Sequence, residues 1–147
     1  LNYFLNEDKI DFFPMMIKTQ EREKVFKFSK RPILNSHPAI CTTQPNFFNP
    51  KDKKFKLGVL KNAYLPEELR NKYIIIENKL EDNFLKMGFK MLLQNKFDGI
   101  FVLDNNLIKG KRVPANMTCR TTNKSLPTHF IMKKESTKDF PPTRTLP

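Results

Sequence analysis

Thr19 and Arg22 are the residues of this chain whose types and spacing best suit ligand binding. They lie in residues 11–29, DFFPMMIKTQEREKVFKFS, where an apolar strand leads into a short charged helix. Thr19 is a favoured N-cap residue, and Arg22 follows three positions later in the first helical turn. The free amides and the positive dipole end of a helix N-terminus, together with a guanidinium, form a compact receptor for a carboxylate. The alternative is that Arg22 is an ordinary solvated side chain on a surface helix.

Residues that usually carry metal or catalytic chemistry are sparse. Cys41 and Cys119 are too few and too far apart to define a zinc site, and His37 and His129 have no ligand spacing. The two cysteines can form a disulfide only if their strands are neighbours, which the sequence leaves open. There is no Gly-rich phosphate loop and no Ser/His/Asp set. We therefore expect no catalytic residues, no metal and no cofactor.

The composition is that of a globular protein with a strong positive charge. The 147 residues are 39% hydrophobic, include 14 Phe and no Trp, and carry a formal net charge of +12. This length suffices for one domain with a core, or for a lobe of a larger protein. The charge would suit a nucleic acid or an anionic membrane surface, and it would equally suit a lysine-rich proteome. Because the lysines are scattered and no recognised binding motif accompanies them, no nucleic-acid partner is expected.

The sequence contains no candidate membrane helix and no visible leader. No apolar run approaches the roughly 20 residues that a membrane-spanning helix needs. The sequence begins at Leu1 without a methionine and shows no signal peptide. We expect the chain to be a fragment, with any targeting segment upstream of Leu1.

The middle of the chain alternates strands and helices, as is typical of an α/β protein. Strands are predicted at residues 56–60 (KLGVL), 73–77 (YIIIE) and 97–104 (FDGIFVLD), with helices at residues 65–73 and 78–95. Right-handed crossovers make such a βαβαβ unit a largely parallel sheet with helices on its faces. In these sheets ligands bind beyond the carboxyl ends of the strands.

That rule singles out the residues that follow the first and third of these strands. Lys61–Tyr64 follows the first strand, and Asp104 ends the third. Each position also has a purely structural alternative. Asn62 suits a turn, Tyr64 can pack on the following helix, and Asp104–Asn106 can cap the next segment.

The flanking regions are less regular. Leu1–Leu5 has the pattern of a helix end, and Ala39–Thr43 and Thr128–Met132 suit strands. The Pro- and Asn-rich stretch 31–50 suits a crossing between two lobes, because prolines favour extended chain. Residues 133–147 are expected to form a loosely ordered tail.

These motifs together resemble bacterial family 3 extracellular solute-binding proteins, the polar amino-acid receptors of ABC transporters. Residues 10–33, IDFFPMMIKTQEREKVFKFSKRPI, resemble the family segment D…T-x-x-R…V-x-F-S-x-P. The order that follows is similar as well, with AICTT as a crossing strand, KLGVL opening the second lobe, then YIIIE, LLQNKFDGIFVLD and a final FIMKKES. The resemblance covers most of the chain up to about Lys134.

The resemblance implies an α/β, type II periplasmic-binding-protein-like fold with one largely complete lobe and a partial second lobe. Residues 1–35 would be the C-terminal portion of the first lobe, and residues 36–132 would be the second lobe. Residues 133–147 would return to the first lobe. The first part of lobe one would precede Leu1.

The resemblance also implies a set of ligand contacts. Arg22 matches the arginine that clamps the ligand's α-carboxylate, and Asp104 approximates the acidic residue that takes its amino group. The loop after the first strand matches the second-lobe helix start that also donates to the carboxylate. The implied ligand-binding residues are Thr19, Arg22, Asn62, Ala63, Tyr64 and Asp104.

The chain departs from the family pattern at several of these positions. Met15, Met16 and Ile17 stand where small hydroxyl residues are common, and Asn62-Ala63 stands where Gly-Thr or Thr-Thr is common. Asp104 falls about one position late.

The function implied by the resemblance is that of a solute-binding protein of an ABC transporter, or a fragment of one, and not an enzyme. It would be periplasmic or otherwise extracytoplasmic, with a signal peptide upstream. As a monomer it would hold a small polar ligand, an amino acid or a similar carboxylate, between two lobes and deliver it to the transporter permease. Two alternatives stay open: a sensor or recognition domain of a larger receptor or enzyme, and a small basic nucleic-acid-binding protein.

Overall fold

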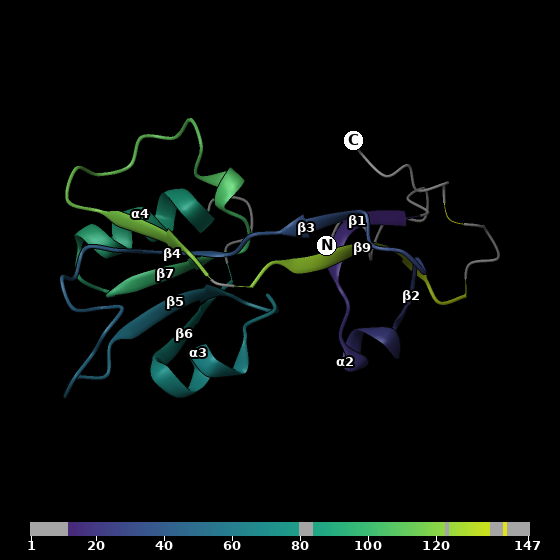
Figure 1. The fold of residues 1–147 in the computed structure, drawn as a ribbon, viewed down its shortest axis with the longest axis horizontal. Coiled ribbons are helices and arrows are strands. Elements are labelled where there is room, and N and C mark those ends of the chain that lie inside the picture. Colours follow the sequence, from purple (N-terminus) through teal and green to yellow (C-terminus); the bar gives the residue numbers. More distant parts are fainter. Residues whose placement is uncertain (1–11, 80–83, 123, 136–139, 141–147) are drawn as a thin grey trace. The chain divides into compact units, whose positions relative to one another are not determined.

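The computed structural model describes residues 12–79, 84–122, 124–135 and 140. Backbone contacts divide the chain into two units. Unit 1 comprises Leu1–Ser36 and Ser125–Pro147, and unit 2 comprises His37–Lys124. The chain therefore passes from one unit to the other twice, once after Ser36 and once after Lys124 (Figure 1).

Unit 1 is built on one long strand, β9 (Leu126–Lys133), which pairs antiparallel with three other strands. β1 (Phe12–Ile17) lies along one edge of β9, and β2 (Phe26–Phe28) and β3 (Leu34–Ser36) share the other edge. The register of β1 shifts between Phe13 and Met16, where Pro14 cannot donate a ladder hydrogen bond. One buried apolar cluster of this unit contains Met16, Phe26 and Ile131.

Unit 2 contains a five-stranded sheet of order β6-β5-β7-β4-β8. β5 (Lys56–Leu60) pairs parallel with β6 (Ile74–Asn78) on one side and with β7 (Gly99–Val102) on the other. β4 (Ala39–Thr42) and β8 (Thr118–Thr121) extend the sheet in antiparallel pairing. The parallel βαβαβ unit that the sequence predicts is thus confirmed as one side of the sheet, β6-β5-β7. The sheet as a whole is mixed rather than largely parallel, because β4 and β8 pair antiparallel.

Two helices cover opposite faces of this sheet (Figure 1). α4 (Phe84–Leu93) packs on the face that carries Ile100, and α3 (Glu67–Lys72) lies on the face that carries Phe101. Neighbouring residues of β7 point to opposite faces because side chains alternate along a strand. α4 buries Phe84, Gly88, Phe89 and Leu92, whose helical spacing forms one apolar stripe.

Phe47 and Tyr73 form the centre of the core on the α3 face. Their rings stack with centroids 4.5 Å apart and an interplanar angle of 8°. The Tyr73 hydroxyl donates a hydrogen bond of 2.9 Å to the Phe47 carbonyl. The strand residue beneath Phe47 is Gly99, and a Cβ there would lie 2.5 Å from the Phe47 Cζ atom. Only glycine leaves room for this ring over the sheet.

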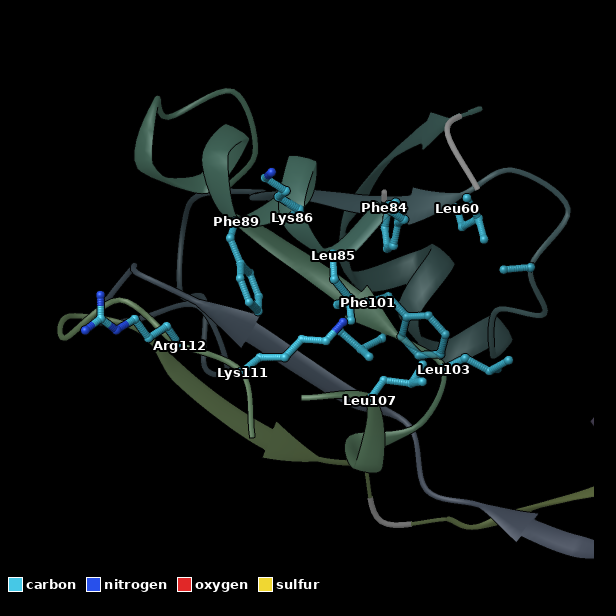
Figure 2. A pocket seen from close by; sticks show the side chains of 12 residues that line it. Leu60, Phe84, Leu85, Lys86, Phe89, Phe101, Leu103, Leu107, Lys111 and Arg112 are labelled. Atoms are coloured by element: carbon cyan, nitrogen blue, oxygen red, sulfur yellow. The ribbon is translucent and has the colours of Figure 1, made fainter. Parts of the chain in front are cut away.

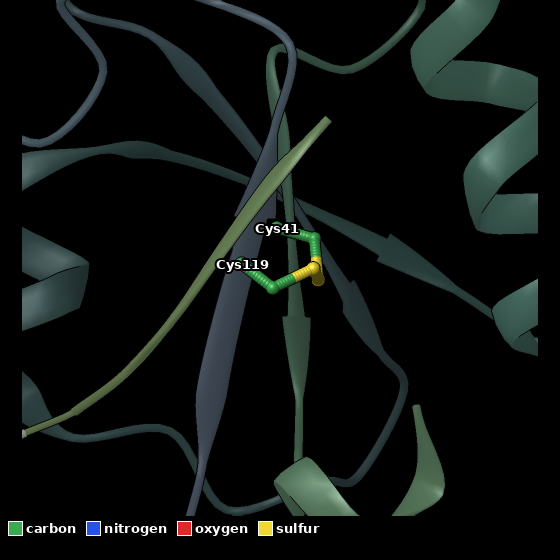
Figure 3. The surroundings of a disulfide bond; sticks show 2 residues. All are labelled: Cys41 and Cys119. Atoms are coloured by element: carbon green, nitrogen blue, oxygen red, sulfur yellow. A yellow bond between two sulfur atoms is a disulfide. The ribbon is translucent and has the colours of Figure 1, made fainter. Parts of the chain in front are cut away.

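A disulfide joins Cys41 of β4 to Cys119 of β8 (Figure 3). The two residues are direct partners in the antiparallel register of these strands. The two cysteines therefore lie on neighbouring strands, which is the condition for a disulfide that the sequence leaves open.

The structure differs from the predicted lobe boundaries in residues 125–132. The prediction includes them in the second lobe, whereas they belong to unit 1, because β9 pairs with β1, β2 and β3. A strand pattern such as THFIM identifies a strand but not the sheet that receives it.

Several predicted elements differ in extent or lie outside the described residues. The predicted helix start at Asn78 is the last residue of β6, and the helix is described from Phe84. The predicted helix end at Leu1–Leu5 and most of the tail after residue 135 lie outside the described residues. Within the described residues, no helix has the length and hydropathy that crossing a bilayer requires.

Candidate functional site

Thr19 is the N-cap of α2 (Gln20–Glu23), as the sequence predicts. Its backbone is extended, with φ −134° and ψ 158°, and its Oγ1 accepts a hydrogen bond of 3.2 Å from the Arg22 amide. The side-chain oxygen thereby satisfies one of the amides that a helix start leaves without an intrahelical partner.

The Arg22 guanidinium is fixed against the end of β1. Its Nη1 donates a hydrogen bond of 2.8 Å to the carbonyl of Ile17, the last residue of that strand. The side chain is half-buried, and burial lowers the pKa of Arg22 from its ordinary value. Arginine nevertheless keeps its charge at neutral pH, so Arg22 is an oriented cation at the edge of unit 1.

The loop at residues 61–64 forms a tight turn after β5. Asn62 adopts a left-handed conformation with φ 67°, which Asn tolerates better than most residues. The Ala63 amide donates to the Leu60 carbonyl at 3.0 Å, so the turn itself uses this donor. α3 begins only at Glu67, after Pro66, and Pro66 makes no side-chain cap. α3 therefore begins two residues after its predicted start at residue 65, with Pro66 as its N-cap.

Asp104 caps a short helical turn. It is the N-cap of the 3-10 helix η1 (Asn105–Leu107), and its Oδ1 accepts a hydrogen bond of 2.8 Å from the Asn106 amide. The side chain is buried, with 8% of the residue exposed. The structural alternative for Asp104–Asn106 is therefore confirmed, and a contact between Asp104 and a ligand stays a prediction.

A cavity of about 650 Å³ lies at the carboxyl ends of β5 and β7 (Figure 2). It is lined by Leu60, Ala63, Phe84, Leu85, Lys86, Phe89, Phe101, Val102, Leu103, Leu107, Lys111 and Arg112. Ala63 comes from the loop after β5, and Leu103 immediately precedes Asp104. The cavity thus lies at the sheet edge where α/β proteins bind ligands. Of the residues predicted for unit 2, Ala63 lines it, whereas Asn62, Tyr64 and Asp104 are not among its lining residues.

No protein-family model and no curated protein sequence matches the chain. Several solved structures do match the chain. ArgBP from T. maritima is similar with a TM-score of 0.65 and 18% identity, over 92% of this chain and 60% of that chain. The fold is that of the periplasmic binding proteins.

Two further structures with this fold are similar to the chain. An amino acid ABC transporter substrate-binding protein from Streptococcus pneumoniae, bound to L-arginine, has a TM-score of 0.63 and 17% identity over 91% of this chain and 59% of that chain. The BvgS periplasmic domain of B. pertussis has a TM-score of 0.66 and 12% identity, over 93% of this chain and 28% of that chain. The chain spans about 60% of the length of the two transporter-type binding proteins.

Within this periplasmic-binding-protein-like fold, the predicted site residues fall into two groups. Thr19 and Arg22 are in unit 1, and Asn62, Ala63, Tyr64 and Asp104 are in unit 2. Asn62 is exposed, and Ala63 and Tyr64 are half-buried. Their roles toward a ligand stay predictions.

The described residues offer little else with catalytic or metal chemistry. They contain no group of three or more His, Cys, Asp or Glu side chains that could hold a metal ion. His129 is buried in unit 1, where its Nδ1 hydrogen-bonds the Ser29 carbonyl at 2.9 Å. His129 therefore has a structural partner within the sheet.

Sequence reasoning missed most of the residues that line the cavity. Leu85 and Phe89 belong to the apolar stripe of α4, which looks like ordinary core in the sequence. Lys111 and Arg112 belong to the basic run KGKR, residues 109–112, which had no assigned role. The sequence signal that could have pointed to Lys111 and Arg112 was a basic run shortly after a strand end.

Proposed function

We propose that the chain is the ligand-binding part of an extracytoplasmic solute-binding protein that serves an ABC transporter. The observation that carries the proposal is the Arg22 guanidinium, half-buried and oriented by the Ile17 carbonyl at the end of β1. An oriented guanidinium presents several donors in a fixed fork, a geometry that matches the two oxygens of a carboxylate.

The proposed ligand is a small carboxylate solute, with an amino acid as the first candidate. Arg22 takes the carboxylate, and Asp104 takes the ammonium group. Thr19 holds the turn that carries Arg22, and Asn62, Ala63 and Tyr64 contribute from the loop after β5. Support for an amino acid comes from the S. pneumoniae protein, which holds L-arginine on a similar fold.

The proposed location outside the cytoplasm is supported by the disulfide between Cys41 and Cys119. Disulfides persist in oxidising compartments and are rare in the cytosol. The proposed protein partner is the permease of the transporter, with the chain acting as a monomer and without enzymatic activity.

The proposal is tested by calorimetric titration of the oxidised protein with each proteinogenic amino acid. The variant is Arg22→Ala, and the matched control is Arg31→Ala, which removes an exposed arginine of the same unit. Hydrogen bonds to charged groups contribute about 1.5–3 kcal/mol, so Arg22→Ala should weaken binding at least about tenfold while Arg31→Ala leaves it unchanged. Equal affinities for both variants would overturn the role of Arg22.

A second candidate is a sensor domain within a larger receptor. The similarity to the BvgS periplasmic domain, of which this chain covers 28%, supports it. A gene that encodes a transmembrane segment or a catalytic domain in the same polypeptide would favour this candidate, and a gene that lies in an operon with a permease would favour the transporter.

A further inference from the structure

The cavity of unit 2 has apolar walls. Side chains from α4 and from the ends of β5 and β7 form these walls, among them Leu60, Leu85, Phe89 and Phe101. Its volume of about 650 Å³ lies within the range of about 300–1,000 Å³ that is typical of small-molecule sites. The walls therefore suit the apolar body of a small molecule.

Three cationic residues from two separate elements are among those that line this cavity. Lys86 belongs to α4, and Lys111 and Arg112 follow η1. In Figure 2 the Lys111 side chain extends across the lining residues toward Leu85 and Phe101, whereas Arg112 points outward. The cationic character of the cavity is thus not a property of a single lysine-rich helix.

These cations have no anionic partner within the part of the chain that the structure describes. The ion pairs recorded there join Lys18 to Glu23 and Lys124 to Glu68. Among the described residues that line the cavity there is no Asp or Glu. All three of these residues are exposed, and the uncompensated positive charge at the cavity favours an anion and repels a cation.

We propose that this cavity binds a small amphipathic anion, a carboxylate with an aliphatic or aromatic body. The apolar body contacts the walls, and the carboxylate lies near Lys111. This goes beyond the proposed function, because Arg22 takes no part and Ala63 is the only residue proposed to bind the amino acid that also lines this cavity. A ligand with a cationic side chain, such as L-arginine, would instead place its guanidinium beside Lys111.

Octanoate is the probe that tests this site, with octylamine as a cationic analogue of the same length. Calorimetric titration of the oxidised full chain should give an octanoate affinity at least about tenfold above that of octylamine, which corresponds to about 1.4 kcal/mol. Equal affinities, or no binding of octanoate, would overturn the proposal.

Variants then locate the bound octanoate. Lys111→Met keeps the length of the side chain and removes its charge, and it should weaken octanoate binding several-fold. Lys109→Met is the matched control, since Lys109 is exposed in the same loop and does not line the cavity. Equal effects of the two variants would show that octanoate responds to net charge alone and would overturn the site.

A variant that adds a negative charge to the cavity separates loss of the site from misfolding. Leu107 lines the cavity but is 50% exposed, so Leu107→Glu should fold with a urea midpoint close to that of the unmodified protein. It should weaken octanoate binding and strengthen octylamine binding, a reversal that misfolding does not produce. Arg22→Ala should leave octanoate binding unchanged, so that failure of the amino-acid proposal and failure of this site remain distinguishable.

Discussion

The Thr19 hydroxyl accepts a hydrogen bond from the Arg22 amide at 3.2 Å, and the same arginine donates through Nη1 to Ile17 at 2.8 Å. One residue is thus held at both ends, its backbone by the helix cap and its guanidinium by the preceding strand. The cap fixes where Arg22 leaves the backbone, and Ile17 fixes where its charge points. The proposed carboxylate contact depends on both bonds.

Thr19→Ala should lower the free energy of unfolding by about 1 kcal/mol, because the Arg22 amide loses its cap. Thr19→Ser is the matched control and should stay within about 0.5 kcal/mol, since serine keeps the accepting oxygen. Urea denaturation measures both variants. Equal losses in alanine and serine variants would mean that the threonine methyl, and not the hydroxyl, stabilises this turn.

Reducing the disulfide between Cys41 and Cys119 should destabilise the protein by about 2–4 kcal/mol. The bridge spans a sequence separation of 78 residues and therefore restricts the unfolded chain strongly. Urea denaturation of Cys41→Ser/Cys119→Ser and of the oxidised protein gives the difference. Alkylation of the unreduced protein in denaturant should modify neither cysteine, and modification of both would contradict the bridge.

Tyr73→Phe should lower the free energy of unfolding by about 1–3 kcal/mol. The variant removes the donor to the Phe47 carbonyl and leaves that buried acceptor without its partner. Tyr64→Phe is the control, because Tyr64 is half-buried and no hydrogen bond of its hydroxyl is recorded among the described residues. A loss of equal size at Tyr64 would show that the effect does not come from this bond.

Tyr73 should also make stability depend on pH in the alkaline range. Burial raises the pKa of Tyr73 above its ordinary value of 10.0. Below pH 10 both the folded and the unfolded protein keep the phenol protonated, and above it the unfolded chain ionises first. Stability should therefore fall as pH rises above about 10, and Tyr73→Phe should show a shallower fall in urea midpoint. Identical slopes would contradict the burial of this hydroxyl.

Gly99→Ala should destabilise the protein by about 1–3 kcal/mol through overpacking. The added Cβ would lie 2.5 Å from Cζ of Phe47, a buried ring that is stacked on Tyr73 and has no room to move. Gly88→Ala is the comparison, because its Cβ would meet the flexible Cδ1 of Ile100 at 3.2 Å and alanine favours a helix. Denaturation midpoints in the reverse order would show that Phe47 can shift.

The parallel strands of unit 2, β6-β5-β7, could be predicted because their signals are local. KLGVL and IIIEN are rich in β-branched and apolar residues, and the intervening segments have helical periods. β3 and β8 could not be predicted, because Leu34–Ser36 and Thr118–Thr121 are short and largely exposed. Such strands owe their conformation to pairing with β9 and β4, partners that lie far away in the sequence.

The candidate site also has parts that the sequence predicts and parts that it does not. The cap at Thr19 depends on residues three positions apart, and a local motif predicts it. The cavity depends on α4, two strand ends and a loop that meet only after folding, so neither Lys111 nor Leu85 stands out in the sequence. Asp104 illustrates the limit, since an acidic residue after a strand fits a ligand contact and a helix cap equally well before the Asn106 contact is known.

Ligand-induced stabilisation of the unmodified protein and of Arg22→Ala tests the central claim most directly. The ligand is the amino acid that binds best in the calorimetric series, added at about 100 times its dissociation constant for the unmodified protein. The account predicts a rise of about 2.7 kcal/mol in the free energy of unfolding of the unmodified protein and a much smaller rise for Arg22→Ala. Equal rises in the two proteins, or no rise with any amino acid, would contradict it.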